Sequence, residues 1–169
     1  MIESLTQHPD IEEWSILNNV EIPSLESTYK VIFMDISEDE HPDEFEVAFK
    51  NLLTMTKERL QEANDYIFSY YRNFVTHVGE GEFEFSISSS NEIWNYISIS
   101  EITISRRPYG NKAVYVSLLG GCEWEEEHGL QIVLKNGKTI SRVSDQDGHL
   151  TWSDAYDDPK LENVIYHEI

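Results

Sequence analysis

Basic residues are scarce in this sequence. Its 169 residues include 12 Lys and Arg against 32 Asp and Glu, a formal net charge of −20. Nucleic acids are polyanions held largely by Lys and Arg, so this shortage argues against a nucleic-acid partner. An acidic surface keeps a protein soluble, and it also speeds and selects encounters with basic proteins. The charge therefore favours a basic protein partner, a class in which nucleases are common.

Cysteine and long apolar runs are also lacking. The single cysteine, Cys122, cannot form an internal disulfide, which fits a reducing compartment. The sequence contains no run of 18 apolar residues, the length that would indicate a membrane span. It also lacks a basic region followed by an apolar run, the pattern of a signal peptide. We expect a cytoplasmic protein with no membrane partner. Because 40 % of the residues are hydrophobic, residues 1–169 can form one domain with a real core.

The first third of the chain contains two extended regions. Residues 14–25, "WSILNNVEIPSL", indicate two short extended pieces around a turn at Asn18-Asn19, with Pro23 at a strand end. Residues 29–36, "YKVIFMDI", are apolar on both faces. That pattern is typical of an interior strand.

A long helical segment follows. From 43 to 78, apolar residues recur at steps of three or four, after a proline, Pro42, that suits a first helical turn. The apolar stripe lapses at 54–58, so this is either one helix or two joined by a kink. Gly79 and Gly81 are good stop signals.

The pattern then changes to alternation, which is typical of β-strands. Residues 82–87 alternate cleanly, and 92–106 alternate with a change of phase near Ser100-Glu101 that a bulge would explain. Residues 113–120 resemble another interior strand, and 162–169 are compatible with a last short one.

Residues 130–143 form the clearest hairpin pattern. Asn136-Gly137 lies between two extended runs, as in a two-residue type I′ turn, which would place Leu134 opposite Thr139. Together these elements predict an α+β fold. Its sheet would be mainly antiparallel, with the helical segment 43–78 packed on one face.

The segment "GGCEWEEEHGLQ", 120–131, concentrates reactive residue types. A zinc site needs three or four ligands in a defined geometry, and the sequence has no second cysteine and no H-E-x-x-H. The surrounding glutamates would raise the pKa of the Cys122 thiol, whereas reactive cysteines lie in electropositive settings. We therefore expect no metal, no cofactor and no enzymatic activity. Two alternatives stay open: an enzyme centred on Cys122, Glu127 and His128, and a regulatory domain for a small ligand.

The same segment has a structural interpretation. Gly120, Gly121 and Gly129 suit a turn or bulge that leads into the hairpin. His128 would then bond a backbone carbonyl. If the segment is extended, Glu126 and His128 share one face while the neighbouring glutamates take the other.

Two acidic blocks are candidate contacts for a basic partner. Residues 35–46 contain seven acidic residues and no Lys or Arg, and residues 123–128 contain four around a tryptophan. Charge runs are commonly just solvated. An aromatic anchor rimmed by carboxylates is also a plausible hot spot, although this tryptophan can equally pack in the core. The candidate contacts are Asp39, Glu40, Asp43, Glu44, Trp124, Glu125 and Glu126.

The pattern Cys122-x-Trp124-Glu125-x-Glu127-His128-Gly129-Leu130 resembles a C-x-W-(D/E)-x-E-H-G-(L/I) signature. That signature is typical of a family of uncharacterised bacterial domains, some of them beside toxin genes that include contact-dependent growth-inhibition loci. The resemblance spans roughly 14–147, and residues 143–151, "VSDQDGHLT", depart from the family's V-G-x-x-D pattern. It supplies no catalytic residues. It implies a cytoplasmic immunity protein that binds and neutralises a basic toxin, in particular a nuclease domain.

Overall fold

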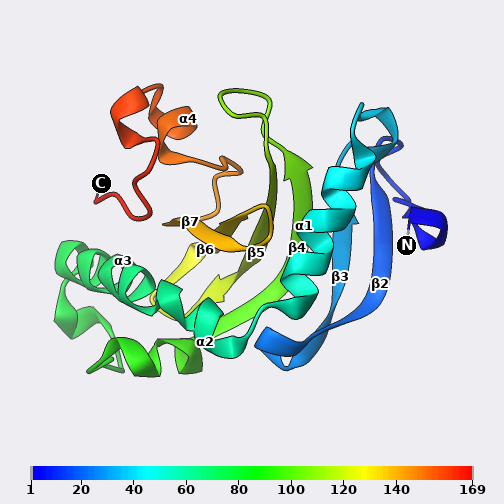
Figure 1. Ribbon diagram of the computed structural model, residues 1–169. Helices are drawn as coiled ribbons and strands as arrows, with labels where there is room; N and C mark the ends of the chain where they lie inside the picture. Colours follow the sequence, from blue (N-terminus) through cyan, green and yellow to red (C-terminus); the bar gives the residue numbers. More distant parts are fainter. Residues whose placement is uncertain (1, 169) are drawn as a thin grey trace.

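A computed structural model describes residues 2–168, which form one seven-stranded sheet with helices packed against it (Figure 1). The strands are β1 (Thr6–Gln7), β2 (Ser15–Ile22), β3 (Ser27–Phe33), β4 (Ile97–Arg106), β5 (Val114–Cys122), β6 (Glu125–Lys135) and β7 (Thr139–Ser144). They lie side by side in sequence order. Every pair is antiparallel except β3 and β4, which are parallel. The predicted α+β fold with a mainly antiparallel sheet is confirmed.

The parallel pair explains where the helices lie. Parallel neighbours need a long crossover, and here the chain between β3 and β4 contains α1 (Pro42–Thr54), α2 (Lys57–Leu60) and α3 (Asn64–Val78). The predicted segment 43–78 is therefore helical but interrupted. The interruption falls inside the lapse at 54–58, where the hydroxyl of Thr56 accepts a hydrogen bond from the Arg59 amide at 3.2 Å and starts a new helix.

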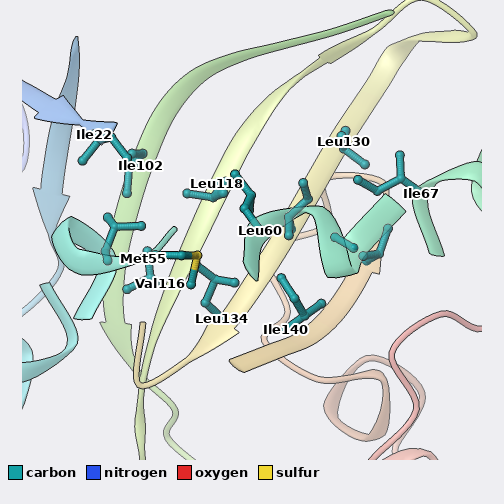
Figure 2. Close-up of a cluster of buried hydrophobic side chains, with 14 of the residues drawn as sticks. Ile22, Met55, Leu60, Ile67, Ile102, Val116, Leu118, Leu130, Leu134 and Ile140 are labelled. Carbon is teal, nitrogen blue, oxygen red and sulfur yellow. The ribbon is translucent and has the colours of Figure 1, made fainter. Parts of the chain in front are cut away.

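The main core lies between these helices and one face of the sheet. Leu60 and Ile67 point toward the strands that carry Leu118 and Leu130, and all four side chains are fully buried or nearly so (Figure 2). Burying a side chain of this size stabilises the fold by about 1.5–3 kcal/mol. A smaller cluster of Tyr115, Val133 and Leu150 covers part of the opposite face. α4 (Trp152–Tyr156) comes shortly after Leu150 along the chain, and the C-terminal residues follow α4 (Figure 1).

Several strand predictions need correction. Within residues 14–25, Ser15–Ile22 form one strand, β2, with a register shift at Asn18-Asn19 rather than two pieces around a turn, and a 3₁₀ turn at Pro23–Leu25 follows it. The expected strand at 82–87 is absent, because a 3₁₀ turn is followed there by irregular backbone. β4 begins at Ile97, since residues 90–96 form a 3₁₀ helix, but its predicted bulge between Ile99 and Glu101 is confirmed.

The hairpin is confirmed but its register was predicted wrongly. Asn136 and Gly137 have positive φ angles of 54° and 66°, as a type I′ turn requires. Leu134 nevertheless lies opposite Ile140 rather than Thr139, because Lys135 pairs with Thr139 and the connection therefore spans three residues, 136–138, instead of two. No strand forms in residues 162–168, the described part of the expected last strand.

Within residues 2–168, no helix combines the length and apolar character needed to cross a membrane.

Candidate functional site

The first acidic block is largely paired within the chain. Arg106 donates to both carboxylate oxygens of Asp39, at 2.6 and 2.9 Å, and to Glu44 at 2.6 Å. The Arg106 guanidinium also holds the pKa of Asp39 below its usual value. Asp39 and Glu44 therefore anchor the start of α1 to β4. Of the four predicted contacts in this block, only Glu40 and Asp43 are exposed without such a partner among the described residues.

The two acidic blocks lie at opposite ends of the sheet. Arg106, beside the first block, ends β4 and pairs with Val114, whereas Ile97 begins β4 and pairs with Cys122 beside the second. Nine residue-to-residue steps of extended strand separate these ends, which corresponds to about 30 Å. The structure therefore does not bring together the candidate contacts of the two blocks.

Trp124 occupies the core rather than the surface. It is 2 % exposed and makes edge-on contacts with Tyr70 and Tyr71, at ring-centroid distances of 5.7 and 5.6 Å. Its predicted role as an exposed aromatic anchor is wrong. The structural alternative is the one that the molecule adopts.

Glu125 organises a wide bulge at the start of β6. Its carboxylate accepts hydrogen bonds from the amides of Glu127 at 2.9 Å and His128 at 3.2 Å, and it contacts the His128 ring at 3.3 Å. The same contact raises the pKa of His128. Gly129 closes the bulge with a φ of 64°, and a Cβ there would lie 2.4 Å from the carbonyl oxygen of Gly120.

This bulge corrects two expectations. His128 bonds a carboxylate, not a backbone carbonyl, and its side chain is 55 % exposed. The side chains of this segment also do not alternate strictly between two faces. Potential ligand atoms of Glu125, Glu127 and His128 lie within 4.8 Å of one another, so His128 is on the same side as the two glutamates. In the described part of the chain this is the one group of three or more potential metal ligands, and Cys122 is not part of it.

Cys122 is poorly placed for catalysis. It is 5 % exposed, and its Sγ lies 3.6 Å from the carbonyl oxygen of Glu125. Burial raises the pKa of the thiol to about 12. A thiolate at this position is therefore disfavoured at neutral pH.

A shallow hollow lies in front of the bulge. The acidic groove, as we call it, has a volume of about 610 Å³ and lies between the end of α3, residues 82–85 and the β5–β6 turn. Its carboxylates are Glu82, Glu84, Glu123, Glu125, Glu126 and Glu127, and its apolar lining includes Phe74, Val78, Phe83 and Phe85. No Lys or Arg lines it. The groove thus joins the second predicted acidic block to carboxylates that the sequence did not associate with it.

A second, narrower hollow adjoins the groove. The aromatic pocket has a volume of about 290 Å³ and shares Phe74 and Glu125 with the groove. Its other lining residues include Tyr70, Ser144, Asp145, Trp152, Tyr166 and His167. The C-terminal residues form one wall. Tyr166 is fixed there because its hydroxyl accepts a hydrogen bond from Asn73 at 2.8 Å.

Sequence reasoning missed Glu82, Glu84 and the C-terminal wall of the pocket. The signal for the two glutamates was present in "EFEF", the alternation of acid and aromatic residues at 82–85. This alternation predicts a strand, but in the structure it places Phe83 against Phe74 of α3 while the two glutamates are exposed.

Searches for related proteins give a family but no activity. No curated protein and no solved structure matches the chain. Residues 1–150 match a family described as Domain of unknown function (DUF6985). Since the match covers most of the 169 residues, the chain belongs to the DUF6985 family.

Proposed function

We propose that this protein is a cytoplasmic immunity protein that binds a basic toxin domain, in particular a nuclease, and neutralises it by occlusion. The observation that carries the proposal is the acidic groove, whose lining combines six glutamates with the rings of Phe74, Phe83 and Phe85 and contains no Lys or Arg. Carboxylates crowded at one place repel one another, so a basic partner that neutralises them gains affinity there. The net charge of −20 and the resemblance to domains encoded beside toxin genes support the same function.

The mechanism is competition for the cations of the toxin. A nuclease holds phosphates with Lys and Arg, and the glutamates of the groove would pair with those side chains and cover the active site. Glu126 is the exposed member of the predicted contacts here, whereas Glu125 holds the bulge and Trp124 is buried in the core. Glu40 and Asp43 lie about 30 Å away, at the other end of β4, so we place the contact at the groove.

The charge of the whole chain would assist the encounter. A negative field attracts a positive domain before contact and raises the association rate. Salt screens such a field, since the Debye length is about 8 Å at 0.15 M ionic strength. The association rate with the toxin should therefore fall as salt is added, more steeply than the dissociation rate rises.

The proposal expects a toxin gene beside the gene of this protein, and the test uses the polypeptide that such a gene encodes. We expect the two purified chains to form a complex, and expression of this protein to protect cells from the toxin. The variant Glu84→Gln/Glu126→Gln should weaken binding by roughly tenfold or more, since both charges lie at the contact. The control, Glu40→Gln/Asp43→Asn, changes the net charge equally at the opposite end and should change affinity by less than about threefold. Absence of both complex and protection would refute the proposal.

A further inference from the structure

The aromatic pocket combines aromatic rings with carboxylates in one small hollow beside the acidic groove. Aromatic side chains of Tyr70, Phe74, Trp152 and Tyr166 form its walls, and the carboxylates of Glu125 and Asp145 lie among them. No Lys or Arg lines the pocket. In the described part of the chain, no Lys or Arg forms an ion pair with Asp145 either.

Two of the chain's own arginines, Arg106 and Arg142, lie against the same combination of groups. The guanidinium of Arg142 lies 4.3 Å from the centre of the Trp152 ring and donates to both oxygens of Asp147. Arg106 lies 5.6 Å from the Phe45 ring while it pairs with Asp39. In both cases one face of the cation meets an aromatic ring and its edge meets a carboxylate, the arrangement that suits a planar guanidinium.

We propose that the aromatic pocket is a receptor for an arginine side chain of the basic partner, with Asp145 as its counter-charge and Phe74 and Tyr166 as aromatic walls. This inference rests on the proposed function and names the chemistry that one part of the contact would recognise. Because the pocket shares Phe74 and Glu125 with the acidic groove, a chain lying in the groove could place one side chain into the pocket.

The electrostatics of Asp145 agree with this role. Burial is the largest influence on its pKa and raises it, with a further contribution from Asp147, while Arg142 and His128 lower it by less. Arg142 is already held by Asp147. The Asp145 carboxylate is therefore insufficiently compensated by the chain itself, and an incoming cation would stabilise it.

The first test needs no toxin. The probe is N-acetyl-arginine methylamide, titrated into the ¹⁵N-labelled full chain, with the Trp152 indole N–H and the Ser144 and Asp145 amides as reporters. We expect saturable shifts at these groups. The neutral isostere N-acetyl-citrulline methylamide should bind roughly tenfold more weakly, because it lacks the charge that the rings and carboxylates attract.

The variants separate a specific site from general attraction to an acidic protein. Asp145→Asn should weaken arginine binding roughly fivefold or more, since a charge-assisted contact is lost. Asp43→Asn removes the same charge at the far end of the sheet and should leave binding unchanged. Asp145→Asn should also melt at a higher temperature at pH 7, because burial of the charged form costs stability that the amide does not lose.

Three results would overturn the inference: equal binding of citrulline, equal loss in Asp145→Asn and Asp43→Asn, or a lower melting temperature for Asp145→Asn. Its failure is distinguishable from that of the proposed function. If the toxin complex forms and Asp145→Asn leaves its affinity unchanged, the pocket assignment is wrong and the immunity function stands. If arginine binds at the pocket but no toxin complex forms, the immunity function is wrong and the cation site stands.

Discussion

Removing the charge of Asp147 tests how the chain holds its buried arginine. The side chain of Arg142 is 0 % exposed, and its two terminal nitrogens lie 2.5 and 2.6 Å from the oxygens of Asp147. One of them also donates to the carbonyl oxygen of His149 at 2.7 Å. In Asp147→Asn the amide is close in shape to the carboxylate, so the change removes the charge and one of the two acceptor oxygens without leaving a cavity.

The expected cost follows from the burial of the two partners. Removing one partner of a fully buried ion pair costs about 3–5 kcal/mol, because the other charge is left without compensation. The Asp147 side chain is 30 % exposed, so water can reach part of this site. We therefore expect a loss of about 2–3 kcal/mol in the free energy of unfolding. For a chain of this length that lowers the melting temperature by about 4–12 °C.

Urea unfolding at pH 7, followed by tryptophan fluorescence, would measure the loss. The matched control is Glu26→Gln, which removes one charge from an ion pair with Lys57 whose side chains are 69 % and 51 % exposed. Such a pair contributes at most about 1 kcal/mol. If Asp147→Asn is no more destabilising than Glu26→Gln, the guanidinium of Arg142 does not depend on Asp147, and the reasoning fails.

Three further predictions concern the bulge, the thiol and the C-terminal residues. Gly129→Ala should lose at least about 2 kcal/mol of unfolding free energy in urea, since it places a Cβ at positive φ and 2.4 Å from a carbonyl oxygen. Gly121→Ala meets nothing within 4 Å and should be nearly neutral. The Cys122 thiol, whose pKa burial raises to about 12, should resist a disulfide reagent at pH 8 until urea is added, and rapid native labelling would contradict this. Arg107 lowers the pKa of Glu162 to about 2, so the stability that Glu162 contributes is complete above its unfolded pKa near 4.5. This stability is lost as pH falls from there toward 2, and Glu162→Gln should abolish that part of the pH profile of the melting temperature.

Much of the fold could be predicted because its signals are local. The helical stripe depends on side chains three and four residues apart, and it locates α1 and α3 to within a few residues. Its lapse marks the break at Met55-Thr56, where a short polar side chain starts the next helix. The bulge between Ile99 and Glu101 was predictable for the same reason, since a one-residue change of phase moves every later side chain to the other face.

The failed strand at 82–87 shows what local pattern cannot decide. Alternation predicts which side chains share a face. A strand also needs a neighbouring strand whose backbone pairs with its N–H and C=O groups, and the local pattern does not show whether one is present. Here the Ile87 amide donates to the Tyr71 hydroxyl at 3.0 Å, so a side chain of α3 satisfies it. Phe83 and Phe85 pack against Phe74 and Tyr96 without entering a ladder.

The candidate site was predictable only in part, for a related reason. Counting charges identified the two acidic blocks, but the state of each carboxylate depends on a cation far away in sequence. Arg106 lies 67 residues from Asp39 and pairs with it, which turns a candidate contact into an anchor for α1. Glu125 serves a similar internal purpose through the amides of its own bulge.

Internal pairing therefore separates structural carboxylates from those available to a partner. Asp39 and Asp147 each meet an arginine of the chain, and their charges are compensated when the protein is alone. Asp145 lacks an ion pair with a Lys or Arg of the described chain, and the acidic groove has no Lys or Arg in its lining. An uncompensated carboxylate weakens the free fold and strengthens a complex with a cation, so the two effects should appear together in one variant. Glu84→Gln/Glu126→Gln should accordingly bind a basic partner less tightly without losing stability, the combination that distinguishes a binding surface from a structural one.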